Sequence, residues 1–160
     1  ILEKEQQMIL DTNVQFVNSA DDVATEAGTS LVGDVVDLGA AGQDPGNGQP
    51  VYLVIQVITA FDGGAGTNGT TQFVLASDAI EALAADNTES RHILTKAFAA
   101  SELAAGAQYV YPLPTGGSEP YERYLGIEVI QATEGEDDGA INAFLTLDPA
   151  GWKSYPDAVN

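Results

Sequence analysis

The amino-acid sequence predicts an all-β fold, an antiparallel β-sandwich of about eight strands with one short helix and extended terminal arms. Gly, Pro, Asn and Asp form turn signals roughly every 8 to 20 residues, and runs of alternating, β-branched residues lie between them. The chain has 160 residues, which fits a single domain, and 44% of them are hydrophobic, which is enough for one core.

The first strands lie on either side of a turn-rich loop. Residues 34–38 are expected to form a short strand that ends at Gly39, and residues 42–50 form a loop because Gly and Asn adopt positive φ angles readily. Residues 51–61 give the strongest strand, and they are apolar on both faces. We therefore expect this strand to be central and covered on both sides, with a neighbouring subunit as one source of the second cover.

The middle of the chain contains the expected helix. The glycine-rich residues 62–69 are expected to form a loop, and residues 70–77 a strand. Asp78 can cap the amides that follow it, Glu81 completes a capping box, and Asn87 suits a helix end. This pattern predicts a short helix over residues 78–87 that depends on packing for its stability.

The second half of the chain returns to strands. They are expected at residues 92–98, 108–111, 123–132 and 140–147, with a single helical turn at 101–106 and an acidic hairpin loop at 134–139.

The expected organisation is an N-terminal arm and first strand region (1–30), a β-sandwich (31–147) and a C-terminal tail (148–160). Met8 is the sole methionine, and we expect the natural domain to begin there. Long arms on a small domain favour an assembly protein, because such arms are a liability unless something binds them.

Composition argues against several classes of function. The 24 acidic and 5 basic residues give a formal net charge of −19, so neither nucleic acid nor a membrane is expected as a partner. The absence of cysteine excludes disulfides, thiol nucleophiles and cysteine-ligated metals. The acidity fits either a salty medium or a basic partner.

Few residues are candidates for chemistry, and we expect no enzyme activity, no cofactor and no metal site. His92 is the one histidine, and no Gly-x-Ser-x-Gly elbow accompanies it, so a structural role is expected. Residues 134–138 and the loop with Asp44 and Asn47 offer oxygen ligands for calcium, but neither has the spaced pattern of a calcium loop. Residues 63–66 lack the lysine of a P-loop and are expected to form a flexible hairpin loop.

Four aromatic residues are candidates for contact with a partner. Tyr109 and Tyr111 lie two apart, on one face of a strand, and belong either to the core or to a contact patch. Trp152 and Tyr155 lie in a tail bounded by Pro and Gly, where they either anchor the chain to a neighbour or fold back on the domain.

From Asp34 onward the chain resembles the jelly-roll capsid cement, or decoration, proteins of tailed, mostly short-tailed, bacteriophages. The order and approximate spacing of several segments carry this resemblance over about two thirds of the chain. The segments are residues 36–40, 48–57, 103–106, 111–114 and 123–127, followed by a hairpin to residues 140–147.

This resemblance implies a structural virion protein with a jelly-roll β-sandwich and no catalytic residues. It implies a position on the outer surface of the capsid, where the protein bridges neighbouring major capsid proteins and stabilises the DNA-filled head. The chain would be made in the host cytoplasm. Strands with two apolar faces suggest that copies also pair with each other, as a homodimer or else a trimer.

Functions of other classes remain open from the sequence. The main alternative is a carbohydrate-binding, lectin-like jelly-roll module, in which Tyr109 and Tyr111 would form an aromatic platform and the acidic loops would hold calcium. A small hydrolase that uses His92, and a trimeric piece of a tail or fibre, are further alternatives.

Overall fold

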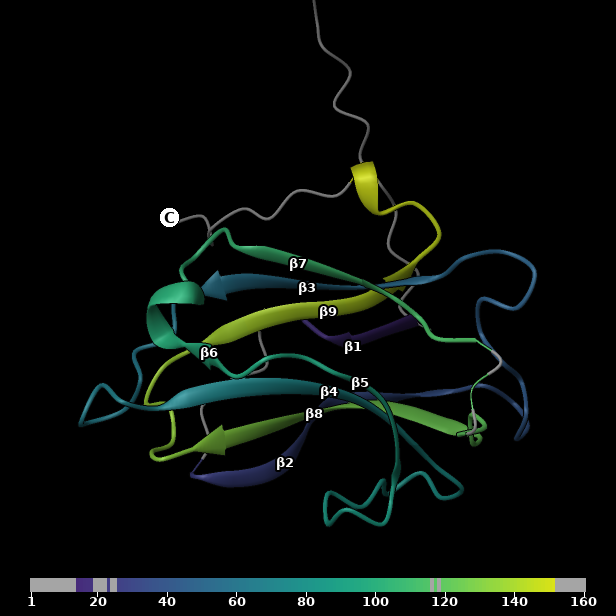
Figure 1. The fold of residues 1–160 in the computed structure, drawn as a ribbon, viewed down its shortest axis with the longest axis horizontal. Coiled ribbons are helices and arrows are strands. Elements are labelled where there is room, and N and C mark those ends of the chain that lie inside the picture. The colour runs from purple at the N-terminus through teal and green to yellow at the C-terminus, as the bar shows by residue number, and fades with distance from the viewer. Residues whose placement is uncertain (1–13, 19–22, 24–25, 116, 118, 152–160) are drawn as a thin grey trace, which may run out of the picture.

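The computed structural model describes residues 14–18, 23, 26–115, 117 and 119–151 (Figure 1). The elements in chain order are β1 (Gln15–Val17), β2 (Gly28–Asp37), β3 (Tyr52–Thr59), β4 (Thr70–Asp78), β5 (Ser90–Leu94), β6 (Phe98–Ala99), η2 (Ala100–Glu102), β7 (Gln108–Pro112), β8 (Tyr124–Ala132), β9 (Ala140–Thr146) and η3 (Pro149–Gly151). Here η denotes a 3-10 helix. No helix among these residues is long and apolar enough to cross a membrane.

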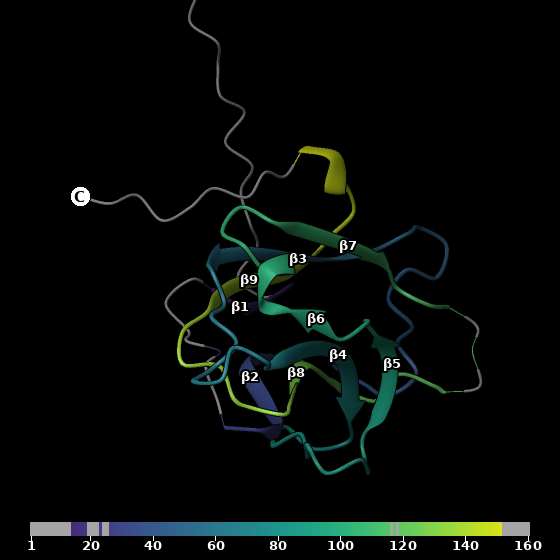
Figure 2. The same ribbon diagram turned by 60° about the vertical axis from the view of Figure 1, so that its left-hand side comes forward.

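The strands form two antiparallel sheets that face each other (Figures 1 and 2). Sheet A has the order β1-β9-β3-β7, and sheet B has the order β2-β8-β4-β5, with β6 also paired to β4. The chain changes sheet at every connection except those from β4 to β6. This alternation winds the strands into a double-sheet jelly roll, which confirms the fold class predicted from the sequence.

The main core fills the space between the two sheets. Alternate residues of the long strands point inward and are buried, as in β3, where Leu53, Ile55 and Val57 are at most 1% exposed. A row of aromatic rings crosses this core. Phe73 packs edge-to-face on Phe61 with ring centroids 6.3 Å apart, and its ring also lies beside Phe98 at 6.2 Å.

Strand β3 is central and buried on both faces, as its sequence predicts. It lies between β9 and β7 in sheet A. On the face directed away from sheet B, Val54 is 0% exposed, Gln56 4% and Ile58 5%. This continuous burial explains why the strand has an almost uninterrupted apolar sequence.

The short helix expected at residues 78–87 is wrong, because this segment is an irregular loop. Residues 79–89, here called the strap loop, run across the outward face of sheet B. The carboxylate of Asp78 does accept from the amides of Ala79 at 2.6 Å and Ala84 at 3.2 Å, so the capping residue is used without a helix behind it. Leu83 inserts between the loop and the sheet, and this packing outweighs a short, marginal helix.

Other elements differ in extent from the sequence expectation. The strand expected at residues 92–98 is divided into β5 and β6 by Thr95, whose hydroxyl accepts from the Phe73 amide at 3.0 Å. Strand β2 begins at Gly28, well before residue 34, and its pairing with β8 shifts register between Val32 and Val36. The helical turn expected at 101–106 is the shorter η2.

A glycine in β2 permits close approach of β1. Gly33 has a φ of +70°, and a Cβ atom there would lie 2.1 Å from the carbonyl oxygen of Phe16. Any side chain at this position would therefore force the two strands apart.

Candidate functional site

The two tyrosines predicted as partner contacts lie on β7, the edge strand of sheet A. Both rings are half-buried and pack against the main core. The Tyr109 ring lies 4.5 Å from that of Phe98, and its hydroxyl donates to the carbonyl oxygen of Glu102 at 2.6 Å. Burial raises the pKa of the Tyr111 hydroxyl. Because both rings face inward, they do not form an exposed aromatic platform of the kind that the lectin alternative requires.

Trp152 and Tyr155, the other two predicted contacts, lie outside the described residues. The chain leaves toward them from a well-defined turn after β9. The Asp148 amide donates to the Thr146 hydroxyl at 3.2 Å, and the Ala150 amide donates to the Asp148 carboxylate at 3.1 Å. This turn leads into η3, which lies beyond sheet A on the side away from sheet B (Figures 1 and 2).

His92 forms a hydrogen bond with a serine, in an arrangement that fits a structural role. Its Nε2 atom lies 2.7 Å from the hydroxyl oxygen of Ser77, which also accepts from the Glu122 amide at 3.0 Å. The imidazole stacks on the Tyr121 ring with centroids 4.0 Å apart. Ser77 is 0% exposed, so a substrate has no access to its oxygen. Burial lowers the pKa of His92, which favours its neutral form.

The acidic loop, residues 134–139, and the glycine-rich loop, residues 62–69, form one interlocked unit. The Glu136 carboxylate accepts from the Gly63 amide and, at 3.0 Å, from the Thr71 hydroxyl. The Glu134 carboxylate accepts from the Gly66 amide at 2.6 Å. These carboxylates therefore hold the backbone of the other loop.

Glycine is required in the interlocked unit because the two backbones touch. A Cβ atom at Gly64 would lie 2.2 Å from the carbonyl oxygen of Gly135. Asp62 adds a further link, since its carboxylate accepts from the amides of Gly64 and Asp137, both at 3.0 Å. These hydrogen bonds, led by the one from Gly64, lower the pKa of Asp62.

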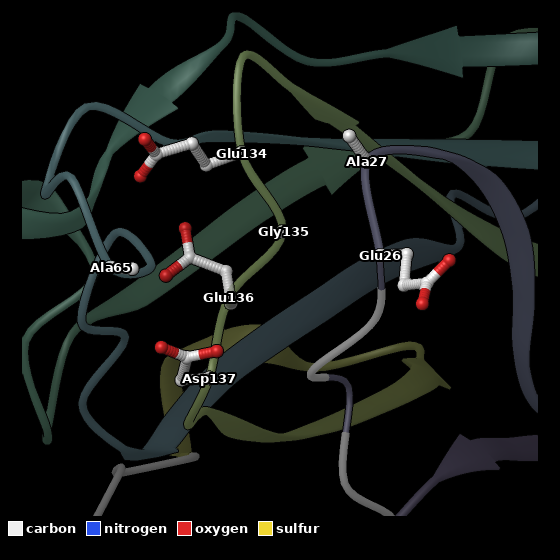
Figure 3. Close-up of a pocket in the computed structure, with 7 residues that line it drawn as sticks. All are labelled: Glu26, Ala27, Ala65, Glu134, Gly135, Glu136 and Asp137. Atoms are coloured by element: carbon white, nitrogen blue, oxygen red, sulfur yellow. The ribbon is translucent and has the colours of Figure 1, made fainter.

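A hollow of about 620 Å³ lies beside the acidic loop (Figure 3). The side chains of Glu134 and Glu136 extend toward the loop that carries Ala65, whereas that of Glu26 points away from them. Across the described residues, no group of three or more Asp, Glu, His or Cys has a geometry that could hold a metal ion. The calcium reading of residues 134–138, and of the turn where the Asn47 amide donates to the Asp44 carbonyl at 3.2 Å, gains no support.

A buried charge cluster on the outward face of sheet B is a feature that the sequence did not predict. Glu128 of β8 is 0% exposed and lies beneath the strap loop with Glu89 and Arg91. The Arg91 Nε atom donates to Glu89 at 2.8 Å, while its Nη2 atom lies 3.3 Å from a Glu128 oxygen without forming a hydrogen bond. Burial, together with the neighbouring Glu89 carboxylate, raises the pKa of Glu128 to about 7.

The two sheets differ sharply in charge. The four strands of sheet A contain no Asp, Glu, Lys or Arg. The strands of sheet B contain five, which are Asp34, Asp37, Asp78, Arg91 and Glu128. In a chain with a net charge of −19, sheet A is therefore a neutral layer on one side of an acidic molecule.

Comparison with known proteins relates most of the chain to one family. No curated protein matches the chain. Residues 18–145, which span the sandwich from the end of β1 to the end of β9, match the Bbp16 family. Bbp16 is a protein of a Bordetella phage. The chain thus belongs to the Bbp16 family of bacteriophage proteins.

Proposed function

We propose that the protein is a capsid cement protein, which binds the outer surface of a phage head and bridges neighbouring major capsid proteins. Membership of a phage protein family and a jelly-roll sandwich support this role. The observation that carries it furthest is the neutral sheet A on a chain of charge −19, because an uncharged apolar side can approach another protein without placing carboxylates against it.

The proposed docking surface is the exposed apolar margin of sheet A. Val110 on the edge strand β7 is 38% exposed, and Leu147, just after β9, is 55% exposed. In this orientation sheet A faces the capsid, and the acidic loops and sheet B face the solvent. The repulsion among carboxylates on neighbouring copies then falls where water and salt screen it.

The mechanism is passive. Internal DNA pressure loads the joints between capsid subunits, and a rigid sandwich bound across a joint adds interface that must break before the joint opens. An interface of standard size, about 1,600 Å², suffices for specific binding. Many copies act together on one head, so a modest affinity per copy is enough. Pairing of copies as a homodimer would let one unit span two joints.

Heads that lack the protein provide the test. Purified protein is added to undecorated heads, and binding is measured by sedimentation and head disruption by a thermal scan. The wild-type protein should bind and raise the disruption temperature. Val110→Asp should abolish both effects, whereas the matched variant Leu94→Asp, on the edge strand of sheet B and 57% exposed in the wild type, should retain them.

Each failure has a distinct meaning. No binding by the wild-type protein would refute the cement role. Equal binding by both variants would refute the docking of sheet A while leaving the role intact. Binding to a glycan array, with a melting temperature that depends on calcium, would instead support the lectin-like alternative. Native mass spectrometry decides between a homodimer, a trimer and a monomer.

A further inference from the structure

The outward face of sheet A has a buried apolar centre. Val54 of β3 pairs with Phe144 of β9 on one side and with Val110 of β7 on the other. All three side chains point away from sheet B, because their sequence neighbours fill the main core. Val54 is 0% exposed and Phe144 1%, whereas Val110, at the edge, is 38% exposed.

The described elements do not account for this burial. Neither Val54 nor Phe144 belongs to the two apolar clusters that the described residues form. On sheet B, the strap loop covers the outward face. On sheet A, η3 is the described element that lies on the outer side, and no described strand lies beyond the sheet there (Figures 1 and 2).

We propose that the C-terminal residues 152–160 of the same chain fold back across this face, with the Trp152 ring over Val54 and Phe144. The turn at Asp148 and the helix η3 direct the chain to this side, and Trp152 follows η3 directly. Nine residues reach up to about 30 Å when extended, which spans several strands at about 4.8 Å each. A tryptophan ring buries 150–250 Å², roughly the area of such an apolar centre.

Two observations favour the C-terminal tail of the same chain over other covers. Val54 is fully buried in a single chain, and a second copy would bring another charge of −19 close to this one. The N-terminal residues instead enter through Val14, which packs against the main core, and continue into β1, at the opposite edge of sheet A from β7.

The sequence offers a clean probe, because the chain contains one tryptophan and no cysteine. The intrinsic fluorescence of the full-length protein therefore reports on Trp152 alone. A single cysteine is introduced by Val110→Cys, beside the proposed tail, or by Leu94→Cys on sheet B as the matched control. Each variant then carries a thiol-reactive nitroxide, which quenches a nearby indole. The experiment uses the isolated protein and does not depend on capsid binding.

The expected result in dilute solution is a blue-shifted emission, low accessibility to acrylamide, and strong quenching by the label at Val110→Cys but not at Leu94→Cys. Emission of the unlabelled wild-type protein at the position of free tryptophan would overturn the proposal. Quenching that rises with protein concentration would assign the cover to the tail of a second copy, which also overturns it. Equal quenching from both labels would place Trp152 elsewhere and have the same consequence.

Discussion

The buried carboxyl of Glu128 should make the protein less stable as the pH rises through 7. Glu128 is 0% exposed, neither of its oxygens accepts a hydrogen bond from the described residues, and the nearest cation, Arg91, is already hydrogen-bonded to Glu89. The charged form of Glu128 is thus poorly compensated. Glu128→Gln keeps the shape of the side chain and removes the titration.

The magnitude follows from the pKa. Burial raises the pKa of Glu128 from an ordinary value of 4.5 to about 7. Since 1 pH unit corresponds to 1.36 kcal/mol, this difference amounts to about 3 kcal/mol. A raised pKa in the folded state means that the stabilising contribution is complete below pH 4.5 and declines as the pH rises to about 7. The variant should therefore match the wild-type protein near pH 4.5 and exceed it by up to about 3 kcal/mol above pH 8.

Urea unfolding, followed by far-UV circular dichroism from pH 5 to 8.5, measures this difference. All other titrating groups are shared, so the difference in unfolding free energy isolates residue 128. Glu102→Gln is the control of opposite sign, because the hydrogen bond from Lys96 lowers the pKa of Glu102 and its removal should weaken the protein at neutral pH. A difference between wild type and Glu128→Gln that stays constant with pH would refute the reasoning.

Three further substitutions test the loops and the histidine. Leu83→Ala should cost about 2–4 kcal/mol of unfolding free energy, and hydrogen exchange should show the amides of the strap loop opening before those of the sheets. Gly64→Ala should lower the melting temperature more than Gly48→Ala, since both glycines have positive φ but a Cβ at Gly48 meets no atom within 4 Å. His92→Phe keeps a ring on Tyr121 but cannot be protonated. Because burial lowers the pKa of His92, the wild-type protein should lose stability relative to this variant as the pH falls below 6.5.

The long strands could be predicted from the sequence because the pattern of each one reports its own burial. Strands β3, β8 and β9 lie at the centre of their sheets, and their residues are apolar on one or both faces. Strand β2 was predicted only in part. Its glycines and small polar residues weaken the alternation, and its bulge between Val32 and Val36 changes which side chains point inward.

The candidate site was harder to predict because its contacts join segments that are far apart in the sequence. The amides of Gly63 and Gly66 bind carboxylates about 70 residues later, and no local pattern reports this pairing. Glu128 occupies a position that resembles the solvated side of an alternating strand. It is buried because the strap loop crosses the strand, and the same loop replaces the helix that the capping residues suggested.

The two sheets solve one physical problem in different ways. A β-sandwich buries the inner faces of its sheets, so an apolar outer face needs a separate cover. Sheet B receives its cover from the strap loop, where Leu83 packs on Val74 and Ala76. If the C-terminal tail covers sheet A, the apolar outer residues of β3 reflect this cover and not a neighbouring subunit. The contacts with a capsid would then fall at the margin of the sheet, near Val110, where apolar surface stays exposed.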